Sequence, residues 1–171
     1  MTPQEFKILV VPLRNKLYRF SKRILDDPED AKDIVQEVFI KLWKKGDDLR
    51  EYKSVEALAM VTTRNLCLDK LKAKKYPLES IDNIRNEVEM KGYEEKQDLS
   101  GIVQKIHQVI KTLPELQRSV IQLRDIEGYD FDEISGILDM NENAVRVNLS
   151  RARKKIREIL VNNKFYEYQR N

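Results

Sequence analysis

The sequence predicts an all-α protein made of two small helical domains joined by a linker. Three observations predict this class. Only five Gly and five Pro occur among 171 residues, whereas Leu, Ile, Glu, Lys and Arg, which favour helices, are abundant. Apolar residues recur at three- and four-residue steps in two separate blocks, and we find no alternating pattern of the kind that indicates a strand. An acidic, weakly periodic segment separates the two blocks.

The first block, residues 1–75, is expected to hold three helices. Pro12 should kink or restart the first helix, whose apolar stripe is Phe6, Leu9, Val10, Leu13, Leu17 and Phe20. Asp27 followed by Pro28 is typical of an N-cap and a first helical position, so it begins the second helix, which Gly46 ends. The predicted buried face of that helix is Ala31, Ile34, Val35, Val38, Phe39 and Leu42. Ser54 can cap the third helix, which reaches about Lys75. Its predicted apolar face is Val55, Leu58, Ala59, Thr62, Leu66 and Leu71.

Residues 76–100 are interpreted as an acidic linker. Tyr76 precedes Pro77, and a residue before proline avoids helical dihedral angles, so the third helix should stop there. The segment holds 3 basic and 7 acidic residues, against 17 and 12 in residues 1–75 and 12 and 10 in residues 101–171. An acidic stretch between two basic ones suggests two surfaces for a polyanion, although solvated helix faces would give the same balance.

The second block, residues 101–171, is expected to be a four-helix domain. A helix begins near Gly101, Pro114 restarts the chain, and the next helix ends at Glu127 and Gly128. Asp130 and Glu133 have the spacing of a capping box for a short third helix over 131–138. Asn141 then caps a long last helix, whose inward stripe is Val145, Leu149, Ala152, Ile156 and Leu160.

The last two helices, with the tight turn between them, predict a helix-turn-helix at Asp130–Arg157, in which the second helix enters the major groove of DNA. Between Asn143 and Arg157 there are six basic residues and no acidic one. The side chains expected to point outward are Arg146, Val147, Ser150, Arg151 and Lys154. Arginines suit guanine edges or phosphates. Further along, phosphate contacts are expected from Arg153, Lys154, Lys155 and Arg157. The alternative is a basic solvated face on an ordinary bundle helix.

Two further stretches are candidates for binding. The strip Asp30–Trp43 should expose a polar ridge made of Asp33, Gln36, Glu37, Lys41 and Lys44, which spacing alone does not separate from a solvated surface. The basic helix end Arg64–Lys75, preceded by a polar loop with Tyr52, could follow a phosphate backbone and hold unstacked bases. Lysine-rich helix ends are common, so this pattern is weak by itself.

Little in the sequence suggests catalysis. His107 is the sole histidine and has no evident nucleophile or metal-ligand companion, and no glycine-rich phosphate loop occurs. Cys67 is the sole cysteine, which excludes an intramolecular disulfide and a cysteine metal cluster; we expect a small core residue. We therefore expect no enzyme, no cofactor and no metal. The amino terminus resembles neither a signal peptide nor a membrane span, so a cytoplasmic protein without membrane insertion is expected.

Three stretches resemble one known family: DPEDAKDIVQEVFIKLW (27–43), RNLCLDKLK (64–72) and LPELQRSVIQLRDIEGYDFDEISGILDMNENAVRVNLSRARKKIRE (113–158). They are similar to the extracytoplasmic-function sigma factors, the smallest members of the sigma-70 family of bacterial RNA polymerase sigma factors. They span both blocks in the family's order. The third is the most specific, because LPE, the RDIEG turn and the SRARKK helix stand at the family's intervals.

The resemblance implies a role for each stretch. The first domain would be sigma region 2 and would dock on the clamp helices of the β′ subunit of core RNA polymerase through Asp33, Gln36 and Glu37. Its third helix would melt and read the minus-ten element, with Arg64, Asn65 and Lys72 near the single strand. The second domain, sigma region 4, would read the minus-thirty-five duplex through Arg146, Val147, Ser150 and Arg151, with Lys154 also on the DNA.

The resemblance also implies partners. They are core RNA polymerase, including its β flap, promoter DNA, and an anti-sigma factor that holds the protein inactive. The acidic linker would occupy a polymerase channel, and such proteins have no catalysis of their own. Two other functions remain open from the residues alone. One is a stand-alone helix-turn-helix regulator with an N-terminal sensing or dimerisation domain, and the other is a helical adaptor that binds only protein.

The sequence departs from the family pattern at several positions. Leu58 stands where many relatives carry an aromatic residue, and Thr62 replaces a usual aliphatic one. In the helix-turn-helix turn, Asp139 stands where glycine is usual; Asp can adopt left-handed dihedral angles at modest cost, so we expect the turn to survive. Gly136 should weaken the preceding helix by about 1 kcal/mol relative to Ala.

Overall fold

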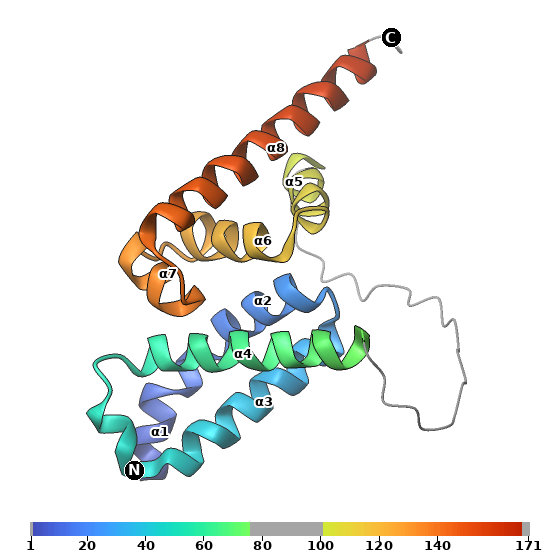
Figure 1. Cartoon of the computed structure of the whole chain (residues 1–171). Coiled ribbons are helices and arrows are strands. Elements are labelled where there is room, and N and C mark those ends of the chain that lie inside the picture. The colour runs from blue at the N-terminus through green and yellow to red at the C-terminus, as the bar shows by residue number, and fades with distance from the viewer. Residues whose placement is uncertain (1, 76–100, 169–171) are drawn as a thin grey trace.

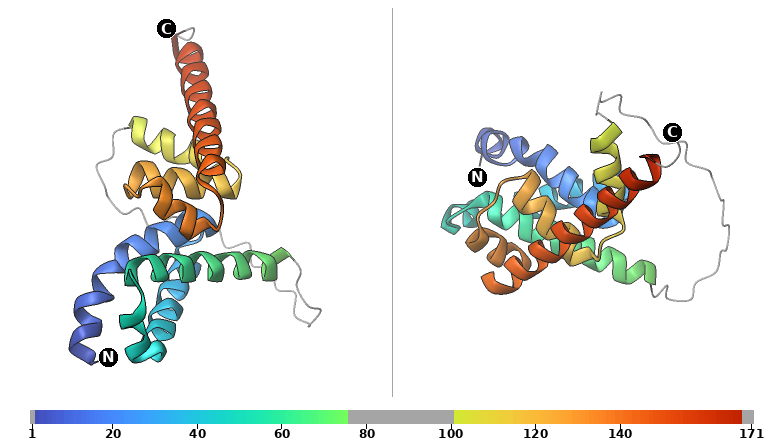
Figure 2. Two further views of the ribbon diagram at one scale, coloured as in Figure 1. Left: turned by 60° about the vertical axis from the view of Figure 1, so that its left-hand side comes forward. Right: turned by 90° about the horizontal axis from the view of Figure 1, so that it is seen from above.

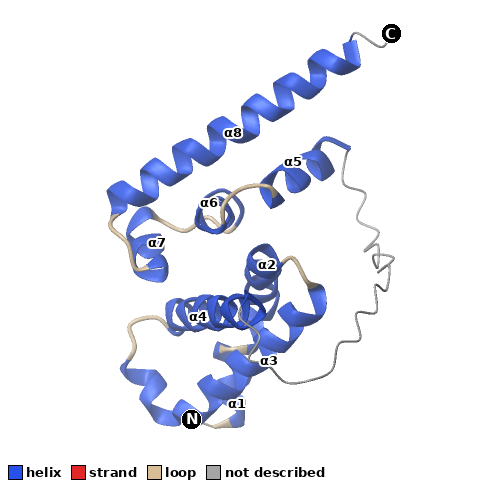
Figure 3. Ribbon diagram, turned by 45° about the vertical axis from the view of Figure 1, so that its right-hand side comes forward, coloured by secondary structure: helices blue, strands red, loops and turns tan. Residues whose placement is uncertain are grey.

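The computed structural model describes residues 2–75 and 101–168, with side chains as far as residue 162. Within these ranges every regular element is a helix, as Figures 1 and 3 show, which confirms the predicted all-α class. The segment 76–100, interpreted as a linker, lies outside the described residues.

The N-terminal unit holds the elements α1 (Pro3–Leu9), η1 (Val11–Leu13), α2 (Arg14–Leu25), α3 (Pro28–Lys45), η2 (Gly46–Glu51) and α4 (Val55–Lys75). The first predicted helix is interrupted at Pro12, where η1 makes a short 3₁₀ turn between α1 and α2. Helices α2, α3 and α4 pack on one another. The three predicted helices of this block are therefore present, with the first divided as the proline indicated.

Local hydrogen bonds explain where these helices begin and end. The carboxylate of Asp27 accepts hydrogen bonds from the backbone N–H groups of Glu29 (2.9 Å) and Asp30 (3.0 Å), which caps α3. Gly46 follows α3 with a φ of 54°, a left-handed conformation that suits glycine. The hydroxyl of Ser54 accepts a hydrogen bond from the N–H of Ala57 at 3.0 Å and so caps α4. All three predicted boundaries are confirmed.

The C-terminal unit holds α5 (Gly101–Lys111), α6 (Glu115–Ile121), the π-helical turn η3 (Gln122–Ile126), α7 (Phe131–Leu138) and α8 (Glu142–Tyr168). Helices α5, α6 and α7 all pack against α8. The far half of α8 continues beyond the other helices, as the views in Figure 2 show. Four helices were predicted here and four are present, while the π-helical turn was not foreseen.

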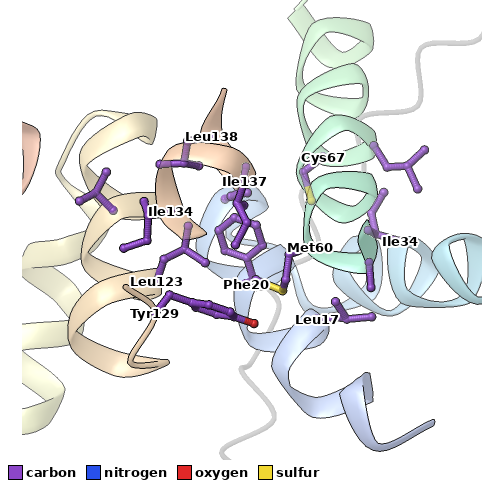
Figure 4. Packing of buried hydrophobic residues seen from close by; sticks show 14 of the residues in the cluster. Leu17, Phe20, Ile34, Met60, Cys67, Leu123, Tyr129, Ile134, Ile137 and Leu138 are labelled. Atoms are coloured by element: carbon purple, nitrogen blue, oxygen red, sulfur yellow. The ribbon is translucent and has the colours of Figure 1, made fainter. Parts of the chain in front are cut away.

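The two units share one hydrophobic core. Helices α2 and α4 of the first unit pack directly on α6 and α7 of the second. Figure 4 shows Phe20 and Met60 beside Leu123 and Ile137, and the side chains of Phe20 and Met60 are completely buried. The described helices therefore form a closed body rather than two separate bundles.

The predicted apolar face of the third helix was incomplete for this reason. Met60, Thr63 and Cys67 are completely buried, although the periodicity had placed none of them on that face. They are buried because α4 is covered both by its own unit and by the C-terminal unit. Burial raises the pKa of the Cys67 thiol to about 12. The complete burial of Cys67 confirms the interpretation that it is a core residue.

A candidate nucleic-acid and polymerase interface

Helices α7 and α8 form the predicted helix-turn-helix. At the start of α7, the backbone N–H of Asp130 donates to the carboxylate of Glu133 at 2.8 Å, which is one half of the expected capping box. At the start of α8, the side-chain oxygen of Asn141 accepts a hydrogen bond from the N–H of Ala144 at 2.8 Å. The predicted caps of both helices are therefore present.

The turn between them depends on Asp139, which has a φ of 52° and a ψ of 54°. This is the left-handed backbone conformation that the turn requires. Asp139 adopts it although aspartate lacks the conformational freedom of glycine. The N–H of Met140 donates to the carbonyl of Ser135 at 3.1 Å, and the hydroxyl of Ser135 donates back to the carbonyl of Met140. The prediction that the turn survives without glycine is confirmed.

The candidate duplex-reading face lies on the outer side of α8. Val145 and Ala152 are completely buried and Leu149 is nearly so, which fixes how the helix is rotated. All five predicted DNA-contacting side chains are exposed as a result: Arg146, Val147, Ser150, Arg151 and Lys154. The structure brings them together on one face of one helix.

Arg146 is held in place by its neighbours. Its guanidinium lies 3.8 Å from the centroid of the Phe131 ring and pairs with Glu142 at 3.3 Å. The guanidinium of Arg124 lies 4.7 Å from the same ring. These contacts hold the guanidinium of Arg146 beside the turn, on the exposed side of α8.

One of the predicted phosphate contacts has another role. Arg153 donates hydrogen bonds to both carboxylate oxygens of Asp125, at 3.0 and 2.5 Å. This paired fork raises the pKa of Arg153 and joins α8 to the end of η3. Sequence spacing could not reveal this pairing, because the carboxylate lies 28 positions away in the chain, and the phosphate contact of Arg153 stays a prediction.

The residues expected near a single strand lie along α4. Asn65 and Lys72 are exposed, whereas Arg64 is half-buried, and its Nε is buried without a hydrogen-bond partner among the described residues. The hydroxyl of Thr62 donates to the carbonyl of Leu58 at 2.8 Å. The two positions that depart from the family pattern thus bond to each other within the helix.

Part of the basic end of α4 is paired inside the N-terminal unit. Lys70 lies 2.8 Å from the carboxylate of Asp30, and Lys74 pairs with the same group. Burial alone would raise the pKa of Asp30, but the two lysines outweigh it and lower that pKa. Lys70 and Lys74 therefore join α4 to α3, which gives both cations a structural role.

The candidate polymerase-docking surface is the outer face of α3. Asp33, Gln36 and Glu37 are exposed, and the carboxylate of Asp33 is only loosely approached by Lys70, at 3.8 Å. Lys41 lies 3.6 Å from Glu37 one helical turn away. The structure therefore presents all three predicted residues together to solvent.

Sequence reasoning missed two apolar residues beside this ridge. Ile40 is 53% exposed and Trp43 is 46% exposed, and Ile40 stands one turn beyond Gln36 and Glu37 on the same face. Trp43 is supported from beneath by Phe6, with ring centroids 5.2 Å apart in an edge-on arrangement. Together they give the ridge a hydrophobic component. The signal in the sequence that could have revealed this component was an apolar residue within a stripe of polar ones.

An apolar groove of about 500 Å³ lies on the C-terminal unit between α5, the π-helical turn and α8. Its lining includes Val103, Ile106, Ile126, Ile156, Leu160 and Val161. Ile126 and Val161 are among the exposed large hydrophobic residues of the described chain. Such a groove suits an apolar helix of a partner protein.

Two family models match the chain in the order of its two units. Residues 9–76 match the model described as Sigma-70 region 2, and residues 103–156 match the one described as Sigma-70, region 4. Together the two matches cover most of the chain. The chain belongs to the sigma-70 family.

The chain is similar along most of its length to curated sigma-E factors, one of them described as an extracytoplasmic-function factor. The ECF RNA polymerase sigma-E factor of Escherichia coli strain K12 is 28% identical over 163 residues, which cover 88% of this chain and 84% of that protein. The RNA polymerase sigma-E factor of Streptomyces avermitilis is 26% identical over 159 residues, covering 91% and 85%. Both similarities extend through region 2 and region 4.

Two solved structures share the fold. One is the sigma factor RpoE in complex with the anti-sigma factor NepR from Bartonella quintana, with a TM-score of 0.69, 20% identity and coverage of 92% of this chain and 97% of that chain. The other is CnrH in complex with the cytosolic domain of CnrY, with a TM-score of 0.67, 18% identity and coverage of 94% and 90%. At these identities the likeness establishes the arrangement of helices.

Neither a metal site nor a membrane span is found in the described ranges. Residues 2–75 and 101–168 contain no group of three or more His, Cys, Asp or Glu side chains that could hold a metal ion. None of the helices in the same part of the chain combines the length and hydrophobicity needed to cross a membrane.

Proposed function

We infer that this protein is a sigma subunit: it binds core RNA polymerase and directs promoter recognition, DNA melting and transcription initiation. The observation that carries this conclusion is the presence of sigma-70 region 2 and region 4 in order on one chain. The exposed basic face of α8 supports it independently, because a helix-turn-helix reads duplex DNA through such a face. The alternative function, a stand-alone helix-turn-helix regulator, is not favoured, because such a regulator does not require a sigma-70 region 2.

The minus-thirty-five element is read by α8 in our proposal. Arg146 and Arg151 have the chemistry to contact guanine edges, and Val147 can pack against a thymine methyl group. Ser150 lies between them, and Lys154, one turn later, is placed to meet a phosphate. The stacking of Arg146 on Phe131 supports this assignment, because it holds the guanidinium beside the turn.

In this proposal, α4 reads the minus-ten element. Asn65 offers an amide to base edges and Lys72 offers charge to the backbone of a single strand. Arg64 completes this set, with a half-buried side chain on the same helix that carries a positive charge. Lys70 and Lys74 are excluded from the set by their pairing with Asp30.

Core polymerase is bound at two places in this proposal. The ridge of Asp33, Gln36 and Glu37 on α3 would meet the β′ clamp helices, with Ile40 and Trp43 adding buried apolar area. The apolar groove of the C-terminal unit would take an apolar helix of the β flap, which the family resemblance names as a partner of the second domain. Its lining, with exposed Ile126 and Val161, supports this.

An anti-sigma factor is a further proposed partner, because one structural relative is a sigma factor in complex with an anti-sigma factor. A protein of this class works in the cytoplasm, where RNA polymerase is found. It supplies recognition and strand separation, while the polymerase supplies the chemistry.

Run-off transcription tests the proposal. The purified protein should bind duplex promoter DNA weakly by itself and should direct core polymerase to defined start sites when the two are mixed. Mapping of start sites after forced expression would identify the promoters. Tight sequence-specific binding without polymerase, together with no transcription in its presence, would contradict the sigma assignment.

A further inference from the structure

The aromatic ring of Phe131 contacts the guanidinium groups of two arginines from different elements. The guanidinium of Arg146 on α8 lies 3.8 Å from the ring centroid, and that of Arg124 in the π-helical turn lies 4.7 Å from it. A cation within about 6 Å of an aromatic centroid is attracted by the negative charge of the ring face. Phe131 is the first residue of α7, which lies beside the start of α8 in Figure 1. This one ring therefore joins η3, α7 and α8.

Each arginine at the ring also has a carboxylate beside it. Arg146 pairs with Glu142 at 3.3 Å, and Arg124 lies 3.5 Å from the carboxylate of Asp130. Arg124 also donates a hydrogen bond to the backbone carbonyl of Tyr129 at 2.7 Å. Two guanidinium groups at one ring repel each other, and the two carboxylates offset that repulsion. The four charges around the ring are therefore balanced, which stabilises the arrangement.

Arg146 keeps hydrogen-bond donors for a ligand while it contacts the ring. Its side chain is 54% exposed, and its contact with Glu142 is made through Nη2. A guanidinium has five N–H donors, and the paired contact with a guanine edge takes two of them. The plane of the guanidinium can thus stay on Phe131 while its edge faces a base.

The packing of α7 does not explain why an aromatic residue stands at position 131. Phe131 is only half-buried, and the core face of α7 is supplied by three buried residues: Ile134, Ile137 and Leu138. An aliphatic side chain would fill the same partly buried place. It would lack the charged ring face that attracts a guanidinium. What distinguishes phenylalanine at this position is its contact with the two arginines.

We propose that Phe131 is a positioning residue for promoter specificity: its ring holds the guanidinium of Arg146 in the orientation that reads one base pair of the minus-thirty-five element. This proposal rests on the sigma function inferred above and deepens the role given to α8. An arginine side chain is long and flexible, so without support it reaches phosphates as well as base edges. Without the ring, Arg146 keeps its charge and loses part of its selectivity.

NMR spectroscopy of the free protein tests the contact. The Nε–Hε resonance of Arg146, identified by its loss in Arg146→Lys, should lie upfield of the ordinary arginine position, because the ring current of Phe131 shields protons above the ring face. Phe131→Leu should return the resonance to the ordinary position. Phe131→Tyr keeps the ring and is the matched control, so it should keep the shift. An unshifted resonance in the unsubstituted protein, or a shift that survives in Phe131→Leu, would overturn the proposal.

Binding of the holoenzyme to a library of single-base promoter variants tests the role in specificity. Phe131→Leu should reduce discrimination by about two- to fivefold at the base pair that Arg146 reads, which Arg146→Ala identifies. Discrimination at the base pair identified by Arg151→Ala should stay unchanged, because Arg151 stands five residues further along α8. Affinity for nonspecific duplex should also stay unchanged, since no charge is removed. Phe131→Tyr should behave as the unsubstituted protein.

A double-mutant comparison separates positioning from a general effect on the fold. In the Arg146→Ala background, Phe131→Leu should change base preference no further, because the side chain that it positions is gone. A further loss in that background, an equal loss at all base pairs, or full discrimination in Phe131→Leu would each overturn the proposal. If Phe131→Leu does not fold, as judged by circular dichroism, Phe131→Met replaces it in every comparison, because a flexible thioether adapts to irregular space.

Failure of the sigma function would give a different result. The unsubstituted protein would then direct no transcription by core polymerase, which contradicts the function inferred above. The resonance of Arg146 in the free protein does not depend on polymerase or on a promoter. It would still decide whether the ring of Phe131 holds the guanidinium.

Discussion

The guanidinium of Arg19 and the carboxylate of Glu127 are joined by two hydrogen bonds of 2.8 Å, although 108 positions separate them in the sequence. Arg19 belongs to the helix that organises region 2, and Glu127 ends the π-helical turn that organises region 4. This pair is one of several contacts that join the two units, beside the hydrophobic core that they share.

Base reading by α8 should be separable from phosphate binding. Arg146→Ala should weaken promoter binding by about 1–3 kcal/mol and relax the preference for one base pair, because a guanidinium aimed at a base edge is lost. Lys154→Ala should weaken binding about equally on all sequences and reduce its dependence on salt. Holoenzyme affinity for a library of single-base promoter variants measures both. If the two substitutions gave the same profile, the rotation assigned to α8 relative to DNA would be wrong.

Charge reversal on α3 should abolish docking. Glu37→Lys should reduce affinity for core polymerase at least tenfold, because the exposed carboxylate is at the centre of the proposed contact. Asp48→Lys is the matched control, since this exposed acid lies outside the ridge. Circular dichroism should show both variants folded. Equal affinities of the two variants would remove this surface from the proposed function.

The apolar groove of the C-terminal unit should be sensitive to charge. Val161→Asp should lower affinity for core polymerase by about tenfold to a hundredfold, because an exposed groove residue that is buried on docking contributes roughly 1.5–3 kcal/mol. Asn162→Asp places the same charge on the next exposed residue, outside the groove, and should have little effect. Competition binding against a labelled reference sigma factor gives both values. A similar loss in the two variants would indicate a general charge effect rather than docking.

Acid should lower the free energy of unfolding through His107. Burial and then the nearby charges of Arg23, Lys22 and Lys111 lower its pKa below the ordinary value of 6.5. A histidine that the folded protein holds neutral contributes stability above the pKa that it has in the unfolded chain, and that stability is lost as pH falls through 6.5 toward the lower value. The free energy of unfolding should therefore fall by up to about 1.4 kcal/mol per pH unit in this window.

His107→Gln separates this effect from other titrations. The amide oxygen of Gln can still accept a hydrogen bond from Arg23 but takes up no proton in this range. The free energies of unfolding measured by urea denaturation at pH 7.5 and pH 5.5 should differ more in the protein with His107 than in the variant. Equal differences in both would assign the pH dependence to other titratable groups.

The N-cap of α3 should contribute measurably to the free energy of unfolding. Asp27→Ala removes the acceptor of two backbone N–H groups and should lower the free energy of unfolding by about 1 kcal/mol. Asp27→Asn retains an acceptor and should cost less. Urea denaturation followed by circular dichroism provides both values. Equal losses in the two variants would assign the effect to charge at the helix terminus rather than to the cap.

The sequence by itself determined the helices and the orientation of the two candidate surfaces. Asp27, Gly46 and Asn141 act on backbone groups within four residues, so their effects are local and can be recognised from neighbouring letters. The rotation of α8 followed from its apolar spacing, because the same residues that face the core place Arg146 and Arg151 outside. The family's motifs lie in these locally determined segments, so the resemblance could be recognised as well.

Only the tertiary structure decided which charged residues are available and which are paired. Arg153 and Lys70 were indistinguishable from their neighbours in the sequence, yet each is paired with a carboxylate on another element. The burial of Met60 and the pairing of Arg19 with Glu127 likewise depend on the packing of α2 and α4 against the C-terminal unit. Such contacts join residues far apart in the chain, and no local period or spacing encodes them. The physical reason is that long-range pairs depend on how whole helices are placed, which local propensities do not specify.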